Sequence, residues 1–121
     1  MKQIICPVDF SESSVRAFGY AAALARWYGA QLTVLHVLPT LDPVLLRGDI
    51  GEPVRIVTPM VRERVLGEMS RSFDLAAVLP QVSLVAEPGD PQTVIIEQAV
   101  SRNADLIVIG RGDVHARPVS D

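Results

Sequence analysis

Short apolar runs alternate along this chain with longer helix-forming runs, and this alternation constrains the fold more than any other feature. The apolar runs are strand-sized and lack polar alternation, as in strands that are covered on both faces. They span residues 3–8, 31–38, 82–86 and 106–109, and the helix-forming runs span residues 15–28, about 58–77 and 91–102. A repeated strand–helix order implies right-handed crossovers and a parallel sheet with helices on both faces. We therefore predict a single three-layer α/β/α sandwich domain over residues 1–121.

Capping residues and chain breakers predict where these elements begin and end. Ser11 is an expected N-cap of the first helix, and Gly29 occupies the position of a left-handed C-cap. Asp90 is the expected N-cap of the last helix, with Pro91 at its first helical position. Residues 39–53 contain several prolines and glycines, which predicts a long loop and the most mobile segment of the chain.

Apolar side chains mark the helix faces that we expect to be buried. In the first helix an alanine-rich run is joined by Phe18, Leu24 and Trp27. In the last helix the inward-facing positions are Val94, Ile95, Ala99 and Val100.

Composition and charge exclude several classes of function. The chain is 49% hydrophobic and 21% charged, which is typical of a globular domain. A net charge of −3 provides no basic excess for a nucleic acid or an anionic membrane surface. No apolar stretch reaches the roughly 20 residues of a membrane helix, no secretory signal opens the chain, and the one cysteine cannot form an internal disulfide. We therefore expect a soluble, cytoplasmic protein.

The last apolar run leads into a glycine turn. Residues 105–110 read as a buried strand that ends at Gly110, and Gly112 follows after one residue. In open α/β sheets, backbone N–H groups of such a turn and of the next helix point at bound phosphate. Residues 113–121 are too few and too interrupted by proline to supply that helix. The sequence thus predicts an incomplete phosphate site.

Four stretches in this order resemble the universal stress protein family. They are Ile4-Ile5-Cys6-Pro7-Val8-Asp9-Phe10-Ser11-Glu12-Ser13-Ser14, Ala21-Ala22-Ala23-Leu24-Ala25, Ala30-Gln31-Leu32-Thr33-Val34-Leu35-His36-Val37 and Ala104-Asp105-Leu106-Ile107-Val108-Ile109-Gly110. The resemblance implies a Rossmann-like sheet of the adenine nucleotide alpha-hydrolase type, homodimerisation and, in one branch of the family, bound ATP. It also implies a role in the stress response.

The resemblance carries a nucleotide site onto particular residues. Asp9 matches an acidic residue beside the adenine and ribose, Pro7 precedes it, and Val37 matches an apolar residue beside the adenine. Ile109 and Gly110 match the end of the last strand and the first glycine of the phosphate loop. Together with Gly112, these residues are the cofactor-binding residues that we predict for ATP or another adenine nucleotide.

The family's ATP signature continues as G-x-x-G, nine residues and then G-[S/T], and this chain departs from it. Asp113 stands at the second glycine position, and the third would lie beyond Asp121. A carboxylate within a few Å of phosphate oxygens repels them by about a few kcal/mol. We therefore expect ATP binding to be impaired or absent. The alternative is an ATP-binding member that holds phosphates at the turn of Gly110 and Gly112, with slow hydrolysis.

No residues form a recognisable catalytic or metal-binding motif. Ser11 and Ser14 are explained by capping, and neither HExxH, CxxC nor G-x-S-x-G occurs. His36 lies within an apolar strand and is interpreted as a core imidazole, and Cys6 as a buried, inert thiol. Asp9 has two interpretations of equal weight, a turn residue and a ligand contact. An enzyme that uses Asp9 with residues of a partner chain remains a rival hypothesis.

The sequence also predicts self-association. The fifth strand of the family is missing, so the strand at residues 106–109 becomes an uncharged sheet edge that is able to pair with another chain. Three explanations stay open: a fragment, a naturally truncated member, or a member whose dimer uses another surface. In each case a homodimer is the expected assembly.

Overall fold

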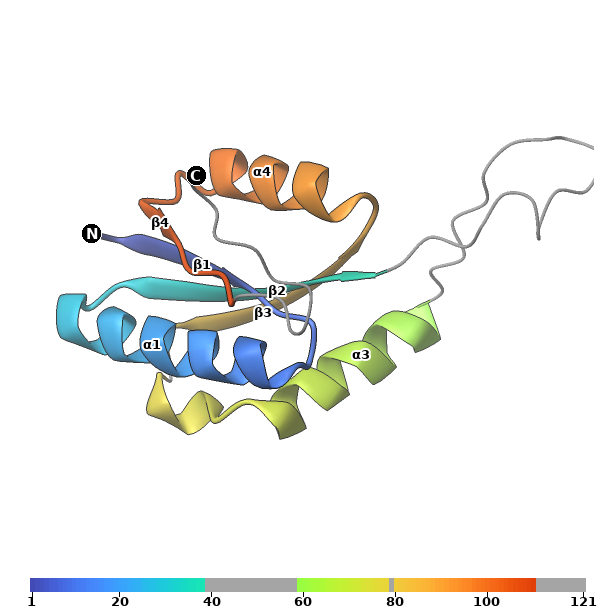
Figure 1. Ribbon diagram of the computed structural model, residues 1–121, viewed down its shortest axis with the longest axis horizontal. Helices are drawn as coiled ribbons and strands as arrows, with labels where there is room; N and C mark the ends of the chain where they lie inside the picture. Colours follow the sequence, from blue (N-terminus) through green and yellow to red (C-terminus); the bar gives the residue numbers. More distant parts are fainter. Residues whose placement is uncertain (39–58, 79, 111–121) are drawn as a thin grey trace, which may run out of the picture.

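Parallel strands form the centre of the molecule, which is described here by a computed structural model covering residues 1–38, 59–78 and 80–110. The strands are β1 (Gln3–Pro7), β2 (Gln31–Leu38), β3 (Val82–Pro88) and β4 (Leu106–Ile107). Within the described residues they make one four-stranded sheet in the order β3-β2-β1-β4, with every neighbouring pair parallel (Figure 1). This confirms the predicted sheet.

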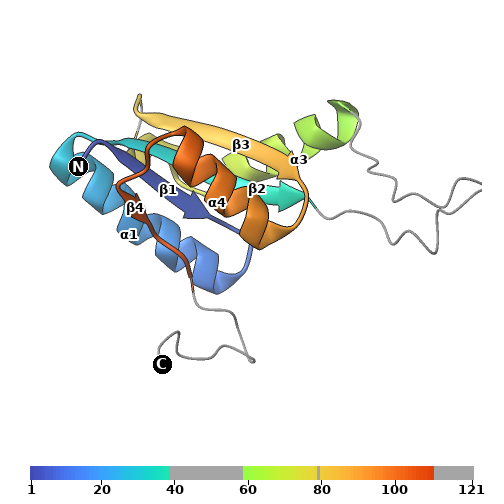
Figure 2. The same ribbon diagram turned by 90° about the horizontal axis from the view of Figure 1, so that it is seen from above.

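Helices cover both faces of this sheet, as the strand–helix alternation predicts. Helices α1 (Glu12–Tyr28) and α3 (Pro59–Ser72) lie against one face, and α4 (Pro91–Ser101) lies against the other (Figures 1 and 2). The larger core cluster lies on the α1 side and includes Ile4, Phe18, Leu32 and Met69. The smaller cluster, with Ile5, Leu35 and Val94, lies on the α4 side. The architecture is therefore the expected three-layer α/β/α sandwich.

The predicted caps are confirmed in detail. The Ser11 side chain accepts a hydrogen bond from the Ser14 N–H, and Gly29 adopts a left-handed conformation with φ 64°. Asp90 accepts from the Thr93 N–H, and Pro91 begins α4. These ends are decided by residues within one turn of each terminus, which explains why they can be predicted locally.

The α3 region and two helix faces differ from prediction. The single helix expected to reach about residue 77 ends at Ser72, and a 3₁₀ turn, η1 (Leu75–Ala77), follows. Between them the Phe73 side chain is buried, with its ring 5.1 Å from that of Phe18. Trp27 and Val100, expected on buried faces, are 83% and 71% exposed. An apolar side chain alone does not show which side of a helix the sheet covers.

Strand β4 is shorter than the predicted 106–109, and Pro7 gives the physical reason. In β1, the carbonyls of Gln3 and Ile5 accept from Asp105 and Val108, so alternate residues of β1 face β4. Pro7 is the next residue in this series and has no N–H to donate. The ladder between β1 and β4 therefore stops before Pro7, and its last pair is Ile5 with Ile107.

Two further expectations concern the edge of the sheet and the loop after β2. Strand β4 pairs with β1 alone in the described structure and so forms one edge of the sheet, as predicted. The loop expected at residues 39–53 lies outside the described residues. None of the helices in the described part of the chain is long and apolar enough to cross a membrane.

Candidate functional site

A cavity of about 260 Å³ opens at the carboxyl ends of β1 and β2. Its lining residues are Pro7, Val8, Asp9, Ser14, Leu35, His36, Val37, Pro91, Ile95, Ile109 and Gly110. Five of the six residues predicted from the sequence, namely Pro7, Asp9, Val37, Ile109 and Gly110, therefore meet around one space. Gly112 lies outside the described residues. The location is the usual ligand position in open α/β sheets, beyond the strand ends.

Asp9 is the acidic group of this cavity, and a small hydrogen-bond network fixes its position. Its Oδ1 accepts from the Ser11 N–H at 3.0 Å and from the Ser14 hydroxyl at 2.7 Å. The Ser14 Oγ in turn accepts from the Asp9 N–H at 2.9 Å. Hydrogen bonds from Ser11, and then from Ser14, hold the pKa of Asp9 below its ordinary value of 3.8, against a smaller opposing effect of burial. The carboxylate is therefore ionised at neutral pH.

The turn after Asp9 has an unusual backbone that aromatic contacts hold in place. Phe10 has φ 68°, a left-handed conformation that is strained for a bulky residue. Its ring centroid lies 4.8 Å from that of His36 and 6.2 Å from that of Phe73. These contacts anchor the turn to β2 and to the end of α3. The strained turn thus places the Asp9 carboxylate at the cavity.

His36 combines the predicted structural role with a position at the cavity. The His36 Nδ1 lies 2.9 Å from the carbonyl oxygen of Val8. A carbonyl only accepts, so Nδ1 carries the proton, and in the neutral ring Nε2 remains an acceptor. The imidazole is thus hydrogen-bonded, as expected, but it is half-buried and lines the cavity instead of lying wholly in the core.

Gly110 is required because the segment that follows β4 runs directly against the start of α1. A Cβ atom at this position would lie 2.6 Å from the carbonyl carbon of Ser13 and closer still to its oxygen. Real Cβ atoms do not approach backbone atoms so closely. Gly110 therefore allows the segment after β4 to approach the amino-terminal turn of α1, which contains Ser14 and follows Asp9.

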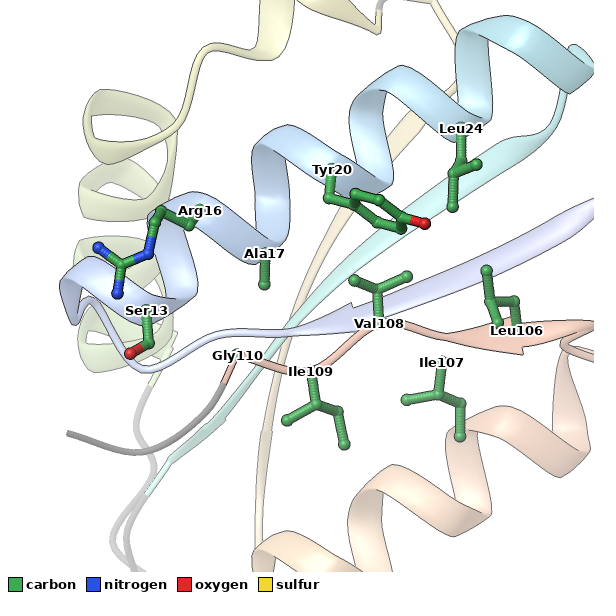
Figure 3. Close-up of a pocket in the computed structure, with 10 residues that line it drawn as sticks. All are labelled: Ser13, Arg16, Ala17, Tyr20, Leu24, Leu106, Ile107, Val108, Ile109 and Gly110. Atoms are coloured by element: carbon green, nitrogen blue, oxygen red, sulfur yellow. The ribbon is translucent and has the colours of Figure 1, made fainter. Parts of the chain in front are cut away.

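A second, larger cavity of about 580 Å³ follows the outer side of β4 (Figure 3). Helix α1 supplies one wall, and β4 with the three residues after it supplies the other. The lining residues are Ser13, Arg16, Ala17, Tyr20, Leu24, Leu106, Ile107, Val108, Ile109 and Gly110. In Figure 3, Leu106 and Val108 point toward α1, whereas Ile107 and Ile109 point the other way. Ile109 and Gly110 line both cavities. This groove is largely apolar, and Arg16 is the charged residue among those that line it.

Several lining residues of the smaller cavity were not predicted as site residues. Ser14 was assigned to capping and His36 to the core, and each has the assigned contact as well as a place at the cavity. Pro91 and Ile95 come from the start of α4, and nothing in their local sequence indicates which strand end they face. A packed parallel sheet would have suggested them, since helix starts and strand ends meet at one edge.

The remaining candidates have structural roles. Cys6 is buried, and burial raises the pKa of its thiol to about 12, which agrees with an inert thiol. Asp90 caps α4. In the described parts of the chain, no three His, Cys, Asp or Glu residues gather as a metal site.

Comparison with known proteins places this geometry in a family. A model of the universal stress protein family matches residues 1–117. The Thermus aquaticus protein described as a universal stress protein in the QAH/OAS sulfhydrylase 3′ region is 30% identical over 110 residues, which cover 90% of this chain and 76% of that protein.

Solved structures share the fold at lower sequence identity. A universal stress protein from Archaeoglobus fulgidus in complex with dAMP is 22% identical with a TM-score of 0.61, covering 90% of this chain and 80% of that one. A universal stress protein in complex with cAMP is 21% identical with a TM-score of 0.59, covering 88% of this chain and 69% of that one.

Proposed function

The chain belongs to the universal stress protein family. From this membership we propose that it is a cytoplasmic binding and regulatory module of the stress response, which self-associates and in which ATP binding is impaired or absent. The observation that carries the proposal is the cavity that gathers Pro7, Asp9, Val37, Ile109 and Gly110 at the strand ends. Relatives of the same fold are solved with cAMP and dAMP, which supports an adenine nucleotide as the ligand class.

The charge of the cavity supports weak binding of a triphosphate. Among its described lining residues Asp9 is an ionised acid, and none is Lys or Arg. Phosphate sites in proteins usually offer a cationic side chain or free backbone N–H groups to the anion. ATP would here place several negative charges near a carboxylate without a cation from the described lining. The adenine and ribose, in contrast, would contact apolar walls and the Asp9 carboxylate, which accepts hydrogen bonds.

Calorimetric titration of the purified protein with ATP, with and without magnesium, tests this part of the proposal. We expect a dissociation constant far above the low-micromolar range. A constant of about 1–5 µM, equivalent to roughly −8 to −7 kcal/mol, would contradict it. Asp113→Gly, which restores the second glycine of the family signature, is expected to strengthen ATP binding.

The alternative function is that of an ATP-binding member that holds phosphates at the turn of Gly110 and Gly112. The observation that favours it is the position of Gly110, which lines both cavities beside the first turn of α1. Low-micromolar ATP binding together with slow release of inorganic phosphate would support this alternative over the weak-binding module.

Self-association is assigned to the outer edge of β4, with a second copy of this chain as the partner. In the described structure β4 pairs on one side only, and the neighbouring Ile107, Ile109 and Tyr20 are 38%, 60% and 64% exposed. Unpaired strand edges bind other strands, and exposed apolar side chains add burial to the backbone hydrogen bonds. A stable dimer would need about 1,000 Å² or more of buried surface.

A further inference from the structure

The charge distribution around the smaller cavity suggests which ligand it selects. Its walls are mainly apolar, with Val8, Leu35, Val37, Ile95 and Ile109 joined by prolines. The polar side chains among the described lining residues are Asp9, Ser14 and His36, and no cationic Lys or Arg is present there. Apolar walls suit a flat heterocyclic base. A single ionised carboxylate suits hydroxyl donors and disfavours an anionic group.

Both helices that begin at this cavity already use acidic or hydroxyl groups of the chain at their amino ends. In α1, the Ser14 N–H donates to the Ser11 Oγ at 3.2 Å, and Glu12 lies in the first turn. In α4, Pro91 has no N–H, and the Thr93 N–H donates to Asp90 at 3.0 Å. Helix starts bind phosphate through such N–H groups and a favourable dipole. Here some of these N–H groups already donate to side chains of the protein, and the nearby carboxylates repel an added anion.

Asp9 retains one oxygen for a ligand. Its Oδ1 accepts from Ser11 and Ser14, whereas no described residue donates to its Oδ2. A carboxylate oxygen accepts hydrogen bonds from the hydroxyls of a ribose, as acidic residues do in other nucleotide-binding sheets. The serine network orients the carboxylate before a ligand arrives.

We infer that the cavity selects an uncharged purine nucleoside over its phosphorylated forms, with the Asp9 Oδ2 accepting from ribose hydroxyls and the apolar walls enclosing the base. This inference rests on the proposed function, because it takes this cavity as the adenine site. The volume of about 260 Å³ lies just below the range of about 300–1,000 Å³ that ligand cavities usually span, so the described cavity suits a small ligand.

Adenosine and AMP form the decisive pair of probes, because they differ only in the phosphate. Calorimetric titrations of the full chain in magnesium-free buffer are expected to give adenosine a dissociation constant at least about tenfold lower than that of AMP, equivalent to about 1.4 kcal/mol. The ratio should shrink as salt is raised from about 0.01 M to 1 M, because salt screens the repulsion between Asp9 and the phosphate. Adenosine should also bind more tightly than 2′-deoxyadenosine, which lacks one ribose hydroxyl.

Substitutions at Asp9 separate recognition from general charge effects. Asp9→Asn removes the charge and is expected to reduce the preference for adenosine over AMP to about threefold or less. Glu97→Gln is the matched control, because Glu97 is an exposed acid on α4 that does not line the cavity, and its removal should leave the preference unchanged. Circular dichroism confirms that each variant is folded before titration.

The possible results separate this inference from the proposed function. If AMP binds as tightly as adenosine, or if neither binds, the nucleoside inference is overturned, while weak ATP binding can still hold. If ATP binds in the low-micromolar range and adenosine is still at least tenfold tighter than AMP, the weak-ATP proposal fails and the nucleoside inference stands. An unchanged preference in Asp9→Asn would overturn the role given to Asp9.

Discussion

Gly110→Ala is expected to destabilise the protein because the new methyl group has no space. Its Cβ would lie 2.6 Å from the carbonyl carbon of Ser13, so either the segment after β4 or the first turn of α1 must move. Overpacking of this kind costs about 1–3 kcal/mol of unfolding free energy. The same displacement would shift a wall that the two cavities share.

Gly19→Ala is the matched control for this substitution. Gly19 is exposed within α1, and a Cβ there meets nothing within 4 Å. Alanine is favoured over glycine in a helix by about 0.8–1 kcal/mol, so this variant should gain stability. The two alanine variants should therefore differ by about 2–4 kcal/mol, with opposite signs relative to the wild type.

Urea denaturation followed by circular dichroism measures both free energies of unfolding, and a thermal scan provides a second reading at roughly 4 °C per kcal/mol. A Gly110→Ala variant as stable as the wild type, with Gly19→Ala behaving as expected, would contradict the steric clash. Such a result would mean that Gly110 does not lie against Ser13.

Three further predictions follow from individual side chains. The pKa values of Asp9 and Asp105 lie below 3.8 in the folded protein, so their contribution to stability is present at neutral pH and is lost as the pH falls below 3.8 through the folded values. Asp105→Asn removes the charged acceptor of the Lys2 and Gln3 N–H groups and should therefore flatten the pH dependence of the urea unfolding free energy in this acidic range. An unchanged slope of that free energy against pH would contradict this prediction. Burial raises the pKa of the Cys6 thiol to about 12, so a thiol reagent at pH 8 should label it only as fast as the protein unfolds locally or globally. Rapid labelling of the folded protein would instead show that the thiol is accessible. Ile107→Lys should shift the dimer toward monomer in sedimentation at micromolar protein concentration. The control Ile96→Lys, at a 53% exposed isoleucine on α4, should leave the dimer unchanged. A monomeric wild type would refute self-association, and a dimer that tolerates Ile107→Lys would exclude the β4 edge as the interface.

Ile107 is a better probe of the edge than its neighbour Val108. Val108 packs against the core on the α1 side, so a lysine there would test folding and association together. Ile107 points away from α1 and is 38% exposed. The direction of a side chain at a sheet edge depends on the register of the whole strand, which only the folded sheet defines.

Local sequence was enough to predict those elements whose ends depend on nearby residues. Ser11 and Gly29 bound α1, and Asp90 with Pro91 begins α4, because each cap satisfies backbone groups within one turn. The strand–helix alternation also predicted the parallel sheet and its helical layers. Family resemblance further indicated Pro7, Asp9, Val37, Ile109 and Gly110, which lie at or just beyond the carboxyl ends of strands and therefore meet at one edge.

Tertiary structure alone decided how these parts face one another. Trp27 and Val100 are exposed because an apolar residue buries only if another element covers its side of the helix. His36 and Ile95 join the cavity through crossovers that bring β2 and α4 to the end of β1. The balance of charge around Asp9 likewise depends on which side chains converge in space, and residue spacing along one strand or helix does not contain that information.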